Sequence, residues 1–516
     1  MQNYNYKLKV WKEWKNTILI GLGIFILALF LRLYNLTSLP IFGDEAIYIR
    51  WAQVMGAEPG LRFLPLSDGK QPLFMWVLMF LVRRFSDPLF IGRLTSVFYG
   101  MGTLVGIFAL SFYLFKSRKA ALIASLLYAI SPYSLFFDRM ALVDSLLAMF
   151  GVWTLYFGVM TAKSKRLDFA MLTGFALGGS LLTKSPASFY AILLPTTWLL
   201  SIPKGGRYRI NHFGRLIFLL AVTYFISFGM YNIMRLGENF QMLGLRNQDY
   251  VYPMSHVLAN PFDPFIPFLR RSLEWFWELG PSPLLILLIA GIVLNLKKFP
   301  KETILLLIWA FIPLLVSAEF AKVFTARYLV FIIPPLTILA ASPFQSHKYR
   351  NIFTILFIFF VFRSLWIDNL ILTNVEAAPL PRSERSGYLE EWTAGVGIKE
   401  VSEILREEYQ HEPKKKIVVG TEGYFGPLPD GLQAYLNDLP EITVIGVGID
   451  ISELPSQLAE SKRAGNKTYL VINSSRLKAD PEKLGLEFVA VYSKVFRPDG
   501  SRDSLYLFGV TEEAIQ

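Results

Sequence analysis

The sequence predicts a polytopic α-helical membrane protein that ends in a small extracytoplasmic α/β domain. Of its 516 residues, 53% are hydrophobic and 43 are phenylalanine, which is more apolar surface than a soluble core needs. Charged residues make up only 18% and lie in short blocks between long apolar runs, whereas a soluble chain spreads them over amphipathic helix faces. Both observations place most of the chain in a lipid bilayer.

Apolar runs set the predicted transmembrane helices. A bilayer core of about 30 Å needs roughly 20 helical residues. Eleven runs meet this requirement, near 17–34, 89–115, 119–137, 141–161, 168–184, 186–202, 213–235, 281–297, 302–319, 327–342 and 351–372. The stretch 72–84 is shorter and ends in two arginines, which favours a re-entrant or interfacial helix. The expected total is therefore about 11–13 helices.

Basic residues predict the orientation. The net charge of +11 comes from short blocks between the apolar runs, without the continuous basic stripe that a nucleic-acid partner requires. Blocks at 116–119, 163–166, 204–209, 297–301 and 347–350 fall in alternate loops. Since cytoplasmic loops carry the lysine and arginine excess, we expect a multi-pass plasma-membrane protein with a cytoplasmic N-terminus. Cysteine is absent, which excludes disulfides and thiolate chemistry.

The predicted division is a membrane domain, residues 1–375, and an extracytoplasmic domain, residues 376–516. The membrane domain includes two large outer loops, 35–88 and 236–280. The tail instead alternates a helical pattern at 398–409 with β-rich runs at 417–419, 443–445 and 469–472, and closes with a hairpin pattern at 488–496 and 504–510. Such alternation is typical of an α/β domain.

Two adjacent carboxylates, Asp44 and Glu45, lie just after the first predicted span. At a membrane interface such a pair can deprotonate an acceptor hydroxyl or hold a metal, with one residue serving and its neighbour supporting. The alternative is a solvated acidic pair that caps a helix over 46–55.

Several cations fall on the predicted outer side, against the usual bias of positive charge toward the inside: Lys70, Arg139, Lys184 and Arg327. Together they indicate an anion site, although each could be an interface anchor. Asp144 lies at the mouth of an apolar run, where a functional or paired role is the default for an ionisable group. It could share a wet cavity with Arg139 or form a structural ion pair.

Metal binding is an open question at this stage. His256 in the second outer loop is one of four histidines, and a single histidine is usually a polar loop residue because a metal site needs two or three convergent ligands.

The order of these motifs resembles GT-C membrane glycosyltransferases, specifically the family of dolichyl-phosphate-mannose protein mannosyltransferases and aminoarabinose transferases. The resemblance covers roughly residues 15–345. It rests on Gly43-Asp44-Glu45-Ala46 with Tyr48, Lys70-Gln71-Pro72-Leu73, Arg139 with Asp144, Thr183-Lys184-Ser185-Pro186, and Arg327-Tyr328 with Pro334-Pro335.

The resemblance implies an inverting transfer of a sugar from a polyprenyl-phosphate donor to a protein, lipid or glycan hydroxyl. Asp44 would be the base, with Glu45 beside it and Tyr48 and Asp144 in support. The four outer cations would bind the donor phosphate and stabilise it as it leaves. No Gly-rich nucleotide-binding loop is found, in agreement with a lipid-linked donor.

One departure from the family concerns a possible divalent metal ion. Some aminoarabinose transferases have a metal-binding glutamate immediately before the loop lysine, where this chain has Gly69. A bound ion would then need Asp68 or His256 as a substitute ligand.

Two other function classes compete with the transferase. A transporter or flippase would use Asp144 and the cations as a substrate pathway, but such proteins generally show internal repeats, and none is evident. A sensor or scaffold would need far fewer spans as an anchor.

Overall fold

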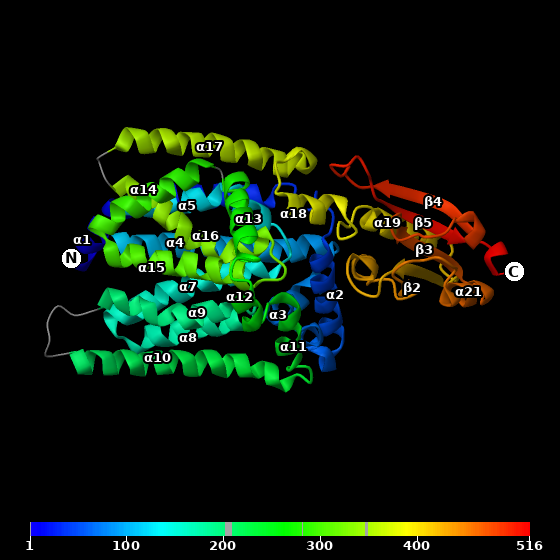
Figure 1. Ribbon diagram of the computed structural model, residues 1–516, viewed down its shortest axis with the longest axis horizontal. Helices are drawn as coiled ribbons and strands as arrows, with labels where there is room; N and C mark the ends of the chain where they lie inside the picture. The colour runs from blue at the N-terminus through cyan, green and yellow to red at the C-terminus, as the bar shows by residue number, and fades with distance from the viewer. Residues whose placement is uncertain (1, 202–208, 281, 346–348, 516) are drawn as a thin grey trace. The chain divides into compact units, whose positions relative to one another are not determined.

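A computed structural model describes residues 2–201, 209–280, 282–345 and 349–515 (Figure 1). The predicted basic blocks at 204–209 and 347–350 lie partly outside these residues. The helices are α1 (Gln2–Leu33), α2 (Gly43–Ala57), α3 (Leu73–Leu81), α4 (Pro88–Phe115), α5 (Arg118–Ala129), α6 (Pro132–Asp138), α7 (Val143–Ser164), α8 (Leu167–Leu181), α9 (Ala187–Leu193), α10 (Arg209–Tyr231), α11 (Met242–Tyr250), α12 (Met254–Ala259), α13 (Phe265–Glu278), α14 (Ser282–Lys298), α15 (Pro300–Phe320), α16 (Ile333–Ala341), α17 (Arg350–Thr373), α18 (Arg382–Arg385), α19 (Ile398–His411), α20 (Leu432–Tyr435) and α21 (Ser456–Arg463). The strands are β1 (Ile417–Glu422), β2 (Ile442–Gly448), β3 (Lys467–Asn473), β4 (Leu486–Ser493) and β5 (Ser504–Val510).

The predicted membrane character is confirmed. In the described part of the chain, seven helices are long and apolar enough to cross a bilayer, or nine if each of two bent helix pairs is one span. Two further apolar helical segments, Leu167–Leu181 and Ala187–Ser201, are shorter. Among the described residues, each of the eleven predicted runs lies largely in helix, but 119–137 is broken between α5 and α6, and by length and composition the candidate spans number seven to nine, against the 11–13 helices expected. The stretch 72–84 forms the short α3 and a 3₁₀ turn, Val82–Arg84.

The chain forms two compact units. The first contains Met1–Asn35, Phe63–Phe74 and Leu94–Pro381, and the second contains Leu36–Arg62, Met75–Arg93 and Arg382–Gln516. The second unit therefore combines the tail with two earlier segments that contain α2 and the start of α4 and lie mostly within the loop predicted at 35–88. The predicted domain boundary at 375 follows sequence pattern, whereas the compact units follow contacts between distant segments.

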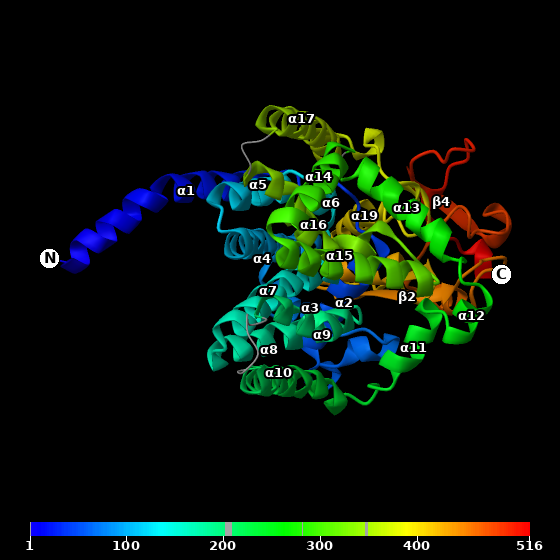
Figure 2. The same cartoon turned by 60° about the vertical axis from the view of Figure 1, so that its left-hand side comes forward.

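Small residues allow close helix packing in the first unit. Helix α8 lies between α7 and α10, as the two views agree (Figures 1 and 2). A Cβ atom at Gly178 would lie 2.5 Å from the sulfur of Met230, and one at Gly174 would lie 2.9 Å from the Thr223 carbonyl oxygen. These glycines let α8 and α10 approach closely, which is how helices associate where lipid removes the hydrophobic driving force.

The second unit contains a five-stranded sheet with the order β2-β1-β3-β5-β4. Strand β1 is parallel to β2 and β3, and the predicted hairpin of β4 and β5 is confirmed as an antiparallel pair. Alternate residues such as Val418, Leu470 and Phe508 build the core under α21. The predicted helix at 398–409 is α19, whose buried positions follow the expected spacing.

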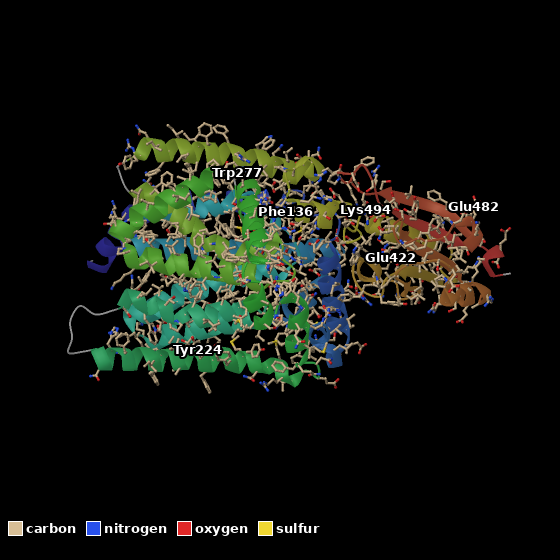
Figure 3. All side chains as sticks on the ribbon, viewed as in Figure 1. Phe136, Tyr224, Trp277, Glu422, Glu482 and Lys494 are labelled. Atoms are coloured by element: carbon tan, nitrogen blue, oxygen red, sulfur yellow. The ribbon has the colours of Figure 1, made fainter. Side chains whose placement is uncertain are left out.

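Polar side chains meet where β1 and β3 end. The Glu422 carboxylate accepts hydrogen bonds from the backbone and side-chain nitrogens of Asn473, each 2.6 Å long. Lys494 is almost fully buried and donates to the Glu391 carbonyl, 3.0 Å away, and to Asp503. Glu422 and Lys494 lie at one end of the sheet and Glu482 at the other (Figure 3). Burial raises the pKa of Glu422 and lowers that of Lys494, because it removes the charged forms from water. The hydrogen bonds and ion pairs of this network offset that desolvation cost, so the network is a structural feature of the domain.

Candidate functional site

Helix α2 places the two candidate carboxylates of the second unit in different environments. Its N-cap is Phe42, whose backbone N–H donates to Glu45, 3.0 Å away, so Asp44 lies in the first turn of the helix. Glu45 is fully buried, and the interpretation of a solvated pair is wrong for this residue. Asp44 is half-buried, at a helix N-terminus where the backbone dipole favours an ionised carboxylate.

Arg93 holds Glu45 in place. Its guanidinium makes a bidentate pair with the carboxylate, with nitrogen–oxygen distances of 2.9 and 2.7 Å. The same guanidinium donates to the carbonyls of Leu36, Leu39 and Pro40 at 2.8–3.0 Å. Breaking this buried pair would leave an uncompensated charge, so Glu45 stays bound to Arg93. Through this contact Glu45 supports the segment that carries Asp44.

The tail segment 393–395 pairs with the residues that precede Asp44, all within the second unit. The Gly43 N–H donates to the Thr393 carbonyl at 3.1 Å, and the Gly395 N–H donates to the Ile41 carbonyl at 2.9 Å. Tyr48 is buried one turn further along α2. The position of Asp44 is therefore set partly by residues about 350 positions away in the sequence.

In the first unit, the loop that carries Lys70 lies beside the loop that carries Lys184. Gln71 donates to the Ser185 hydroxyl at 2.9 Å, and the Leu73 N–H donates to the Leu182 carbonyl at 3.1 Å. Two predicted cations, far apart in the sequence, thus come from adjacent backbone segments.

Lys184 joins a carboxylate and an aromatic ring. Its ammonium lies 2.7 Å from Asp144 at the start of α7 and 4.3 Å from the ring centre of Tyr328. Arg327 immediately precedes Tyr328, and both lie in the 3₁₀ helix Ala326–Ile332. The partner of Asp144 is thus Lys184, and the cluster of Asp144, Lys184 and Tyr328 is partly exposed on its lysine side.

Arg139 caps a helix. Its guanidinium donates to the carbonyls of Leu31, Arg32, Tyr34 and Asn35 at 2.6–3.1 Å, at the end of α1. The last carbonyls of a helix lack partners within the helix, and a cation there satisfies them. A phosphate-binding role for Arg139 remains a prediction, beside this structural one.

The residues proposed as metal ligands do not fit a metal site. Both oxygens of Asp68 face cations, Arg246 at 2.8 Å and Lys70 at 3.2 Å. The His256 ring stacks on Tyr252, with ring centres 3.9 Å apart, and its Nε2 lies 3.0 Å from the Asp263 carbonyl oxygen. Within the described ranges, no group of three or more histidine, aspartate or glutamate side chains could hold a metal ion.

Sequence reasoning did not identify Arg93 or Arg246. Arg93 lies inside the predicted apolar run 89–115, and an ionisable residue in such a run is a signal that could have marked it. Arg246 lies on α11, within the stretch predicted as the loop 236–280, where no sequence pattern distinguishes it.

Comparisons with known proteins agree with this architecture. Residues 69–231 match the model of the family described as dolichyl-phosphate-mannose-protein mannosyltransferase. No curated protein matches the chain significantly. The structure of ArnT from Cupriavidus metallidurans in the apo state is similar with a TM-score of 0.59 and 13% identity, covering 97% of this chain and 99% of that one. The undecaprenyl-phosphate-bound ArnT structure gives a TM-score of 0.56 and 15% identity with the same coverage. The resemblance predicted from the motif order is confirmed: the chain has the GT-C membrane fold, and its residues 69–231 match the dolichyl-phosphate-mannose-protein mannosyltransferase family.

Proposed function

We propose that this protein is an integral membrane glycosyltransferase that moves a sugar from a polyprenyl-phosphate donor to a hydroxyl of a protein, lipid or glycan at the outer face of the membrane. The observation that carries the proposal is the cluster of Asp144, Lys184 and Tyr328 beside the Lys70 loop. A lysine held by a carboxylate and an aromatic ring is a preorganised positive charge, which is what a leaving phosphate requires.

The proposed reaction is an inverting displacement. Asp44 takes the proton from the acceptor hydroxyl, and the hydroxyl oxygen forms a bond to the anomeric carbon of the sugar. The bond between that carbon and the donor phosphate oxygen breaks, and polyprenyl phosphate leaves with the electron pair. Lys70, Lys184 and Arg327 stabilise the phosphate charge. The match to a protein whose structure contains undecaprenyl phosphate supports this class of donor.

The first prediction tests Asp44 as the base. Purified protein in nanodiscs is incubated with polyprenyl-phosphate-linked hexose or pentose, and sugar transfer or donor hydrolysis is measured. Asp44→Asn should lower turnover by at least about 100-fold, because a positioned base contributes this much, and should leave donor binding intact.

Asp168→Asn is the matched control, since Asp168 is exposed and pairs only with its neighbour Arg166 among the described contacts. It should keep wild-type turnover. Equal turnover in wild type and Asp44→Asn would refute the base assignment. Donor binding without turnover on any donor would favour a transporter.

A further inference from the structure

Asp68 is shared by two cations that come from different outer loops. Its Oδ1 accepts from Arg246 on α11 at 2.8 Å, and its Oδ2 lies 3.2 Å from Lys70. Arg246 also pairs with Asp249, 2.7 Å away on the same helix. The result is a row of alternating charges that runs from α11 to Lys70 and connects the second outer loop to the first.

The residue between Asp68 and Lys70 must be glycine. Gly69 has a φ of +66°, a conformation that disfavours other residues. A Cβ atom there would lie 2.6 Å from the Cβ of Arg246 and 2.8 Å from the Met242 carbonyl oxygen. Helix α11 therefore packs directly against the backbone of the loop, and no glutamate fits before the lysine.

The site is thus closed to the metal arrangement that the family resemblance implies. The position of the expected glutamate has no room for a side chain, and the remaining carboxylate has both of its oxygens paired with cations. A divalent ion at Asp68 would be repelled by Arg246 and Lys70.

We propose that Arg246 replaces a divalent metal ion in this protein: acting through Asp68, its guanidinium clamps the second outer loop to the first and positions Lys70 for the donor phosphate. Arg246 is a positioning residue, because its charge is directed at Asp68. The role assigned to Lys70 rests on the proposed function, whereas the clamp and its independence of metal do not.

The first arm tests the metal. The protein is purified without chelator, its metal content is measured by mass spectrometry, and its Tm is recorded with and without EDTA. We expect no stoichiometric divalent metal and no change of Tm with EDTA, together with faster proteolysis of loop 236–280 in Arg246→Met. Stoichiometric metal with a fall of Tm on chelation would overturn the proposal, and so would unchanged proteolysis of Arg246→Met.

The second arm tests the positioning of Lys70 by the affinity for undecaprenyl phosphate. Arg246→Met and Asp68→Asn should each weaken binding about two- to five-fold, the range expected for partly exposed ion pairs. Arg246→Lys should recover part of the loss. Arg270→Met is the control, because Arg270 lies in the same outer loop and its side chain is 83% exposed. In turnover assays Arg246→Met and Asp68→Asn should raise the donor KM and also lower kcat, because Lys70 is assigned both the binding of the donor phosphate and its stabilisation as it leaves.

The outcomes separate the two proposals. Wild-type affinity in Arg246→Met would overturn the positioning role while leaving the transferase intact. Absence of undecaprenyl phosphate binding in the wild type would refute the proposed function, and the metal and proteolysis results would then still decide the clamp.

Discussion

Lys184 combines two roles that a single substitution cannot separate. It neutralises the buried Asp144, whose side chain is 5% exposed, and it presents a charge for the proposed donor phosphate. Removing the lysine alone leaves an uncompensated carboxylate, so a loss of activity in that variant has two explanations.

A double-mutant cycle separates the roles and is our third prediction. Lys184→Met should lower stability by about 3 kcal/mol, because a buried carboxylate loses its partner. The double variant Lys184→Met with Asp144→Leu should recover most of that stability, since neither charge remains. Its transferase activity should stay low, because the phosphate still lacks its cation. Thermal unfolding and turnover are measured on all four proteins, and wild-type activity in the double variant would leave Lys184 a structural residue.

Neighbouring carboxylates can differ completely in role. Glu45 is locked by Arg93 and the Phe42 N–H, whereas Asp44 lies half-buried in the first helical turn. This geometry gives Glu45 the supporting contacts, and the role of Asp44 as the base stays a prediction. Arg93, which lies 48 positions after Glu45 in the sequence, makes Glu45 the supporting residue of the two.

Among the elements, the connection from β1 to β2, which contains α20, joins the sheet of the second unit to α2. Arg50 of α2 donates to Gln433 at 3.1 Å and to Asn437 at 2.7 Å, and Gln53 donates to the Ala434 carbonyl at 2.9 Å. Asp430 in this connection accepts from the Gly426 N–H at 2.8 Å. The sheet therefore supports the helix that carries Asp44.

The fourth prediction concerns the pH dependence of this connection. Burial raises the pKa of Asp430 from 3.8 to about 6, against the opposing effects of the Gly426 N–H and Arg50. The folded state thus binds the proton more tightly than the unfolded chain, so this residue makes stability fall as pH rises from about 4 to about 6. Asp430→Asn keeps an acceptor for Gly426 and should raise Tm at pH 7.5 more than at pH 4.5.

Asp438→Asn serves as a control of opposite sign. Hydrogen bonds from Arg406 lower the pKa of Asp438, so its ionised form stabilises the fold and that contribution disappears as pH falls through the lowered value. The substitution should therefore lower Tm at pH 7.5. An identical pH profile of wild type and Asp430→Asn would contradict the assignment.

At the scale of the whole molecule, the fifth prediction is the topology. Because the chain has no cysteine, single introduced cysteines report orientation without background. Ser501→Cys in the tail should react with a membrane-impermeant maleimide in intact cells. Ser164→Cys, at the last residue of α7 and within the basic block 163–166, should react only after permeabilisation, since basic loops stay in the cytoplasm. The reverse pattern would invert the orientation and place Asp44 on the other side.

Much of the fold follows from local patterns. The eleven apolar runs, the tail helix at 398–409 and the final hairpin all agree with the structure, because hydrophobic length and periodicity are properties of a short segment. The motif order was sufficient to predict the GT-C fold, and it grouped the Lys70 and Lys184 segments, which lie side by side in the structure.

Only the tertiary structure decided which partner each charge takes. Glu45 pairs with Arg93, Asp144 with Lys184 and Asp68 with Arg246, across separations of 48, 40 and 178 residues. Segment 393–395 contacts the residues before Asp44 across a sequence separation that is larger still. A charge interacts through space with whichever group the folded chain brings near it. The residues that flank it in the sequence therefore do not identify that partner. The sequence therefore determined the apolar helical segments, the domain types and the candidate residues, whereas three-dimensional packing assigned each candidate a structural or a chemical environment.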